Sequence, residues 1–166
     1  MPMGFSIVEV PMLSGDKCRI FSILMDGDDE TLYEQFSEAY WDDYKSEVQD
    51  IYNRLMFIGH EGGARLQFFK EHEGAPGDGV SALYDSPNHK LRLYCIVYGR
   101  VSVILGGGGP KPKNIRRWQD DPVLCGSAEQ MKYISRRITD AIRNGDINIT
   151  DDGLSGNLRI NDEDGE

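Results

Sequence analysis

The amino-acid sequence predicts an α+β domain with helices packed on one side of a mainly antiparallel sheet. Apolar segments with the short period of strands occur in groups, two near the N-terminus and three near the middle of the chain. The helical patterns are also grouped, two together after the first strands and one after the middle strands. Because strands and helices do not alternate, this order favours antiparallel pairing over a parallel sheet of strand–helix–strand units.

The first element is expected to be a hairpin. Residues 5–13 and 17–25 are rich in apolar side chains, and the turn-forming segment Ser14-Gly15-Asp16 separates them. Such a pattern is typical of two antiparallel strands. Pro11 suits an edge strand, because it has no amide hydrogen to donate.

Two helices should follow. Thr31 and Glu34 have the spacing of a capping box, and Asp42 and Asp43 are positioned to cap the second helix. The apolar stripe of that second helix has clean three–four spacing and ends before Gly59; it consists of Tyr44, Val48, Ile51, Leu55 and Ile58. The short link between the two helices predicts an antiparallel helical hairpin.

The central strands should be 80–84, 91–98 and 100–105, the last two joined by a tight turn at Tyr98-Gly99. Four glycines follow, Gly106–Gly109, which we expect to form a flexible connection. Ser127 and Gln130 form a second capping-box pattern before a helix from Ala128 to Arg143. The predicted domain therefore spans residues 1–150. Residues 151–166, with six acids and one base, are expected to be an acidic tail containing one weak strand at 158–160.

The charge is distributed unevenly along the chain. The formal net charge is -10, and residues 26–50 contain ten acids and one base. Residues 87–118, in contrast, contain seven Lys or Arg and no acid. The overall balance argues against a protein that binds nucleic acid with its whole surface, but it leaves room for a local anion-binding site.

Several kinds of site are not expected. The three cysteines have neither metal-site spacing nor an even number for disulfides, which indicates reduced thiols in a cytoplasmic protein. No apolar run approaches the roughly 20 residues of a membrane helix. Pro110 follows the glycines where a P-loop requires Gly-Lys-Ser/Thr, so no nucleotide cofactor is predicted. The spacing of His60, Glu61, His72 and Glu73 fits no ligand pattern, so no bound metal is predicted.

The helical pair at 32–58 and the segment 90–113 carry a family resemblance. In that segment a strand with an early arginine, Arg92, leads into a second apolar strand and then a turn rich in Gly and Lys. Over residues 19–143 the chain resembles the RelE/ParE/HigB toxin superfamily, especially its phage-derived branch. Members of that superfamily include ribosome-dependent mRNA endonucleases and poisons of DNA gyrase, usually encoded beside an antitoxin. The resemblance implies a RelE-like fold, mRNA or ribosome binding and an antitoxin protein as partner. Association of the chain with copies of itself is a further possibility.

Cleavage of RNA without a metal requires activation of the 2′-hydroxyl, stabilisation of the phosphorane and protonation of the leaving oxygen. Arginine suits the second task, and lysine or histidine the other two. The candidate catalytic residues are Arg92, Lys111, Lys113 and His89. The candidate RNA-binding residues are Tyr94, Arg116, Arg117 and Trp118. Trp118 stands where some members of the family place a catalytic tyrosine, and an indole cannot exchange a proton as a phenol can.

Three interpretations therefore stay open. The first is a toxin-like, metal-independent endoribonuclease. The second is a non-catalytic RNA- or protein-binding module on the same fold, favoured by the sequence pI of about 4.7 and by the missing tyrosine. The third is an enzyme that binds a small anion at the glycines. At the level of single residues, Arg92 could instead pair with an acid of the first two helices, and Tyr94 could simply pack in the core.

Overall fold

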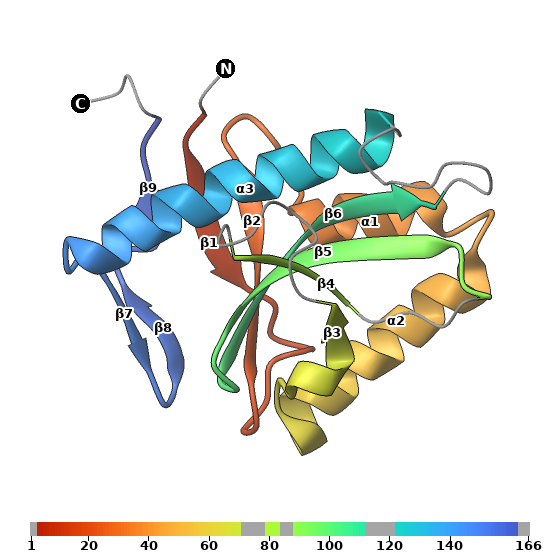
Figure 1. The fold of residues 1–166 in the computed structure, drawn as a ribbon, viewed down its shortest axis with the longest axis horizontal. Helices are drawn as coiled ribbons and strands as arrows, with labels where there is room; N and C mark the ends of the chain where they lie inside the picture. Colours follow the sequence, from red (N-terminus) through yellow and green to blue (C-terminus); the bar gives the residue numbers. More distant parts are fainter. Residues whose placement is uncertain (1–2, 71–78, 84–87, 112–121, 163–166) are drawn as a thin grey trace.

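The computed structural model describes residues 3–70, 79–83, 88–111 and 122–162. Their centre is a seven-stranded sheet with the order β3-β4-β5-β6-β2-β1-β9, and β7 and β8 form a separate two-stranded sheet (Figure 1). The strands are β1 (Phe5–Glu9), β2 (Arg19–Met25), β3 (Phe69–Lys70), β4 (Val80–Leu83), β5 (Leu91–Tyr98), β6 (Ser102–Pro110), β7 (Ile147–Thr150), β8 (Gly153–Gly156) and β9 (Arg159–Ile160). The helices are α1 (Leu32–Tyr40), α2 (Lys45–Phe57) and α3 (Pro122–Arg143), with a π-helical turn at Ile58–Gly62 and a 3₁₀ turn at Leu66–Phe68.

The sheet is mainly antiparallel, as predicted. The N-terminal β-hairpin is confirmed, since β1 pairs with β2 so that Phe5 lies opposite Met25. The central hairpin is also confirmed, since β5 pairs antiparallel with β6. The only parallel pair among the described strands joins β2 to β6, with Arg19 opposite Ser102. The fold class, α+β with a mostly antiparallel sheet, is therefore correct.

The helices cover both faces of the sheet, so the prediction of helices on one side was wrong. One core cluster joins α3 to the first face and contains Ile23, Tyr94 and Ile104. The other cluster joins α1 and α2 to the second face, where Leu93 and Leu105 are buried. Figure 1 shows α3 crossing in front of the sheet, with α1 and α2 on the other side. A strand that is buried on both faces has apolar side chains at successive positions, without polar alternation. This explains why β5 is apolar at nearly every position.

The predicted start of α1 is confirmed, and the predicted boundaries of the other helices need correction. The Thr31 amide donates to Glu34 Oε1 at 2.9 Å and the Glu34 amide donates to Thr31 Oγ1 at 3.2 Å, which completes the capping box. At α2 the N-cap is Tyr44, without a side-chain cap, instead of Asp42 or Asp43.

Gly59 does not end the helical segment. The chain continues through the π-helical turn and leaves it at Gly63, whose φ of 73° favours glycine. Gly59 permits a close approach instead, because a Cβ there would lie 1.9 Å from the Leu13 carbonyl oxygen. The third helix begins at Pro122, before the predicted cap at Ser127; proline suits a first helical turn, where its missing amide hydrogen would have no helical acceptor.

The four glycines belong to a strand, and the predicted flexible connection does not exist. Gly106–Gly109 continue β6 as far as Pro110, and none of the four has a positive φ. A Cβ on Gly106 would lie 2.3 Å from Met131 Sδ of α3, and one on Gly108 would lie 1.8 Å from the Arg92 carbonyl oxygen. The glycines therefore allow α3 and β5 to approach β6 closely.

The chain beyond residue 150 contributes to the core as far as it is described. β8 pairs with β7, and β9 pairs with β1 and forms that edge of the sheet. Leu154 and Ile160 are buried with α3 residues in one cluster. The weak strand predicted at 158–160 is present, but the prediction that residues 151–166 form an acidic tail missed the β7–β8 hairpin and this packing.

Candidate functional site

The open end of β5 and β6 presents a group of basic side chains on the α3 face of the sheet. Alternation along β5 directs Leu91 and Leu93 towards α2 and therefore Arg92 towards α3. Arg92 lies opposite Gly109 in β6, and the backbone amide of Lys111 donates to the Lys90 carbonyl at 2.5 Å. The backbones of Lys90 and Lys111 thus pair at the end of the hairpin, two residues beyond the Arg92–Gly109 pair.

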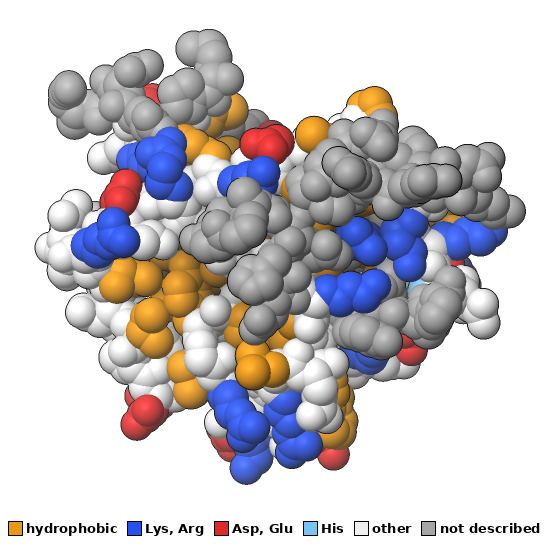
Figure 2. Space-filling model, viewed as in Figure 1, with side chains coloured by type: hydrophobic (Ala, Val, Ile, Leu, Met, Phe, Trp, Pro, Cys, Tyr) orange, Lys and Arg blue, Asp and Glu red, His pale blue; other side chains and the backbone are white. Residues whose placement is uncertain are grey.

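Lys70 joins this group from the edge of the sheet. It pairs with Ala82 in β4, and Ala82 pairs with Tyr94 in β5, so the three side chains share one face. Because Arg92 precedes Tyr94 by two residues, Lys70 and Arg92 belong to the same face. Figure 2 shows Lys and Arg side chains gathered there over the ends of β5 and β6. We call Lys70, Lys90, Arg92 and Lys111 the basic strip.

Helix α3 adds a positive electrostatic contribution at the same place. The helix begins at Pro122, and a Cβ on Gly109 would lie 2.9 Å from Val123 Cγ1, so its first turn lies against the end of β6. The N-terminal end of a helix carries a partial positive charge that favours anions. Arg92 is half-buried, with its Nε atom enclosed, which limits the positions its guanidinium can take.

Tyr94 does not contribute to an exposed platform with Arg92. Its side chain is fully buried in the cluster beneath α3. Its ring cannot stack on a base in this structure, so its predicted RNA-binding role is not available. The reason is that α3 covers the face that was predicted to be open, and the alternative that Tyr94 packs in the core is correct.

His89 lies towards α2, away from the basic strip. Its Nδ1 is 3.9 Å from Asp50 Oδ2, and the same carboxylate pairs with Arg54 Nε at 3.0 Å. Next to it, Glu47 Oε1 accepts hydrogen bonds from the amides of Lys90 at 2.6 Å and Leu91 at 3.0 Å. The contacts of His89 therefore belong to the attachment of β5 to α2, and they do not bring it to Arg92.

The other candidate residues can be divided by whether they are described. Lys111 is described and half-exposed. Four predicted residues lie outside the described part of the chain: Lys113, Arg116, Arg117 and Trp118. Sequence reasoning missed Lys70 and Lys90 as site residues. Lys70 belongs to a two-residue edge strand and has no local signal, whereas Lys90 lies in the basic segment 87–118, just before β5.

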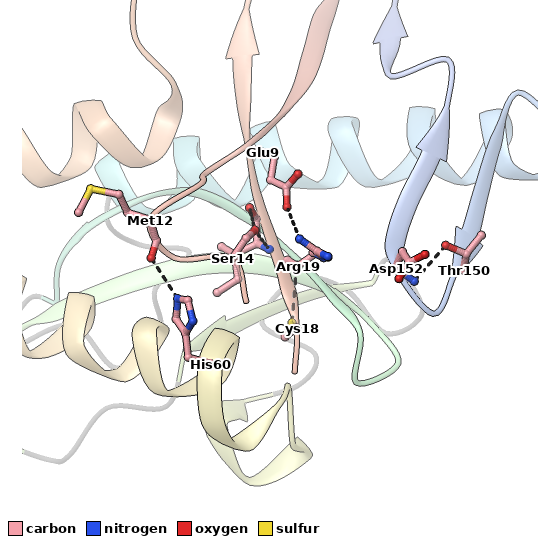
Figure 3. A network of polar contacts seen from close by, with 9 residues as sticks. Glu9, Met12, Ser14, Cys18, Arg19, His60, Thr150 and Asp152 are labelled. Atoms are coloured by element: carbon pink, nitrogen blue, oxygen red, sulfur yellow. Dashed lines mark hydrogen bonds and ion pairs between the residues drawn. The ribbon is translucent and has the colours of Figure 1, made fainter. Parts of the chain in front are cut away.

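A second group of polar contacts, in and around the connection between β1 and β2, has a structural role (Figure 3). Ser14 Oγ donates to the Ile20 carbonyl at 3.0 Å and accepts from the Ile20 amide at 2.7 Å. His60 Nε2 donates to the Met12 carbonyl at 3.2 Å, and Arg19 pairs with Glu9 at 3.7 Å. The His60 bond holds this connection against the π-helical segment, and the other contacts lie within the β1–β2 hairpin.

Two of the three cysteines are inert by burial. Desolvation raises the pKa of Cys18 to about 12 and raises that of Cys95 further still. All three thiols are free. Within the described ranges, no three His, Cys, Asp or Glu side chains come together as a metal ion would require. In the same ranges, no helix has both the length and the apolar character that crossing a membrane demands.

Comparison with known proteins finds no relative. No family model matches the chain, and no curated protein or solved structure is significantly similar to it.

Proposed function

We propose that the protein is an RNA-binding module with a RelE-like arrangement, and that the basic strip contacts RNA phosphates. The order strand, two helices, strands and helix, from β2 to α3, supports the RelE-like part of this proposal. The observation that carries the RNA-binding part is the convergence of the strip with the N-terminal end of α3 on one face of a protein whose net charge is -10. A local positive field on an acidic protein concentrates a polyanion at one place.

The geometry favours binding over catalysis. Phosphate contacts need only cations at the surface, and Lys70, Lys90, Arg92 and Lys111 supply them. Cleavage also requires groups that exchange protons beside the reacting phosphate. Of the two described candidates for that task, His89 lies towards the other face, which leaves Lys111 to exchange both protons.

The test is equilibrium binding of a fluorescent single-stranded RNA at several salt concentrations. Each phosphate contact contributes about -0.7 to the slope of log affinity against log salt. Arg92→Ala and Lys111→Ala should each reduce affinity roughly tenfold, because a charge-assisted contact contributes about 1.5 kcal/mol, and each should flatten the slope by about one contact.

The matched control is Lys17→Ala. Lys17 is exposed in the turn between β1 and β2, so its replacement removes the same charge from another region. Equal losses of affinity in Lys17→Ala and Arg92→Ala would show a general charge effect and would contradict the proposal.

The second candidate function is a toxin-like endoribonuclease acting at the ribosome and neutralised by an antitoxin. The observation in its favour is the restricted, half-buried guanidinium of Arg92 beside the end of α3, which suits stabilisation of phosphorane charge. Induced expression of wild type and of Arg92→Ala/Lys111→Ala, with growth and mRNA integrity measured, tests it. Growth arrest with cut mRNA in wild type alone supports the nuclease; harmless wild-type expression eliminates it and leaves the binding module.

A further inference from the structure

An open groove lies between α1 and α2, on the side of the sheet away from the basic strip. Its volume is about 340 Å³. Tyr33 and Val48 form a nearly buried floor, and Tyr52 and Trp41 form its walls. The Tyr33 hydroxyl is hydrogen-bonded to Ser37, and burial raises the Tyr33 pKa. The floor is therefore apolar and its polar atom already has a partner.

Trp41 is the exposed aromatic residue of this groove. The residue is 40% exposed, although large aromatic residues usually lie inside. Lys45 Nζ lies 5.3 Å from the centre of the indole, at the start of α2. Exposed tryptophans beside apolar depressions are frequent anchors of protein interfaces.

The rim of the groove carries several carboxylates, and the nearby cation, Lys45, lies over the Trp41 ring. Glu34 and Glu38 line the groove, and the carboxyl group of Glu30 lies close to that of Glu38. This contact, with the nearby charges of Glu34 and Asp29, raises the pKa of Glu30. No Lys or Arg of the described residues pairs with any of these glutamates. An occupant that brings positive charge would relieve this repulsion.

We propose that the α1–α2 groove binds a basic amphipathic helix of a partner protein. Apolar side chains at positions i, i+3/i+4 and i+7 of that helix would fill the groove against Trp41, and its Lys and Arg side chains would meet Glu30, Glu34 and Glu38. A second copy of this chain is a poor occupant, because two molecules with a net charge of -10 repel each other. The groove is separate from the basic strip, so this proposal does not rest on RNA binding.

The experiment uses the full chain and two synthetic peptides of about 18 residues, long enough to form a helix on binding. One has leucines on one helical face and lysines on the other, and its counterpart has glutamates in place of the lysines. Calorimetry should detect binding of the Leu/Lys peptide alone. Trp41→Ala should weaken that binding at least tenfold, as expected for an aromatic anchor.

The rim is tested with Glu30→Gln/Glu38→Gln, which leaves the Glu34 capping box intact. This variant should bind the Leu/Lys peptide about fivefold more weakly in low salt, and the difference should shrink in 0.5 M salt. Its melting temperature without peptide should rise, because the carboxylate repulsion is gone. Lower affinity together with higher stability separates a charged contact from simple damage to the helices.

The control for net charge is Asp151→Asn/Asp152→Asn, on the exposed turn between β7 and β8. It should bind the Leu/Lys peptide as wild type does. Equal weakening in this control, equal binding of the Leu/Glu peptide, or binding unaffected by Trp41→Ala would overturn the proposal. A wild-type dimer that becomes a monomer in Trp41→Ala would also overturn it, since the groove would then hold a second copy.

Discussion

Two fully buried serines, Ser22 in β2 and Ser102 in β6, occupy different polar surroundings. Ser22 Oγ donates to the Leu105 carbonyl at 2.8 Å and accepts from the Tyr33 amide at 3.2 Å. It thus joins β2, β6 and the first turn of α1. Ser102 Oγ has no hydrogen-bond partner in the described part of the chain.

Replacing these serines should change stability in opposite directions. Ser22→Ala leaves a buried amide and a buried carbonyl without their partner, which costs about 1–3 kcal/mol. Ser102→Ala removes a buried hydroxyl that makes no hydrogen bond to compensate for its loss of water. The free energy of unfolding of this variant should be unchanged or higher by about 1 kcal/mol. Urea unfolding measures both, and a large loss in Ser102→Ala would show that its hydroxyl has a bonded partner.

The glycines of β6 provide a second contrast between neighbouring residues. A Cβ on Gly108 would lie 1.8 Å from the backbone oxygen of Arg92, which cannot move without disturbing β5. A Cβ on Gly107 would lie 3.6 Å from Ser127 Oγ, an ordinary contact. Gly108→Ala should therefore destabilise by about 1–3 kcal/mol, and Gly107→Ala by less than about 0.5 kcal/mol. Thermal melts compare them; equal tolerance at both positions would indicate the flexible connection that composition alone suggested.

At the scale of elements, Glu47 of α2 fixes the start of β5. Its Oε1 atom accepts the amides of Lys90 and Leu91. Glu47→Ala should lower the free energy of unfolding by about 2 kcal/mol, as for other hydrogen bonds to a charged group. Hydrogen exchange at these two amides should accelerate more than exchange in β1. Glu61→Ala, an exposed glutamate on the π-helical turn, is the control that should change neither.

The acidic face of α1 makes stability depend on pH. The pKa of Glu30 is raised in the folded protein, chiefly by the close carboxyl group of Glu38. A raised folded pKa means that the folded state holds the proton more tightly, so this contribution to stability is present at low pH and is lost as pH rises through the folded pKa. Glu38→Gln removes that interaction and should raise the melting temperature at pH 7, with no gain below the ordinary glutamate pKa of 4.5. A gain of equal size at both pH values would contradict this cause.

Some local signals in the sequence were read correctly, whereas the caps of α2 and α3 and the packing across the sheet were not. The Thr31 capping box and the β1–β2 hairpin depend on residues close in sequence, and both are present. The position of α3 depends on contacts between distant segments. The sequence signal for the position of α3 was the run 91–98, which places apolar side chains on both faces of β5. Such a strand needs packing elements on both faces, and α3 is the one that buries Tyr94. Lys70 reaches the basic strip only through pairing from β3 to β5, which no local pattern encodes.

For the whole molecule, the last described strands complete the sheet and the core. β9 covers the edge of β1, and Arg159 forms a bidentate pair with Asp26 at the end of β2. Ile147, Leu154 and Ile160 pack with residues of β1 and α3 in one cluster. A paired edge is less exposed to strand addition by other chains, so this arrangement also protects the sheet from aggregation.

Removing residues 151–166 should therefore destabilise the entire domain. The truncation exposes the partners of Leu154 and Ile160 and unpairs β1, and burial of each such side chain contributes about 1.5–3 kcal/mol. The expected loss of roughly 3–6 kcal/mol is a large part of the 5–15 kcal/mol typical of a domain. Urea unfolding of the truncated and full chains measures it, and Leu154→Ala/Ile160→Ala in the full chain separates lost packing from lost acidic charge. Unchanged stability in both variants would mean that residues 1–150 fold independently, as a solvated acidic tail would require.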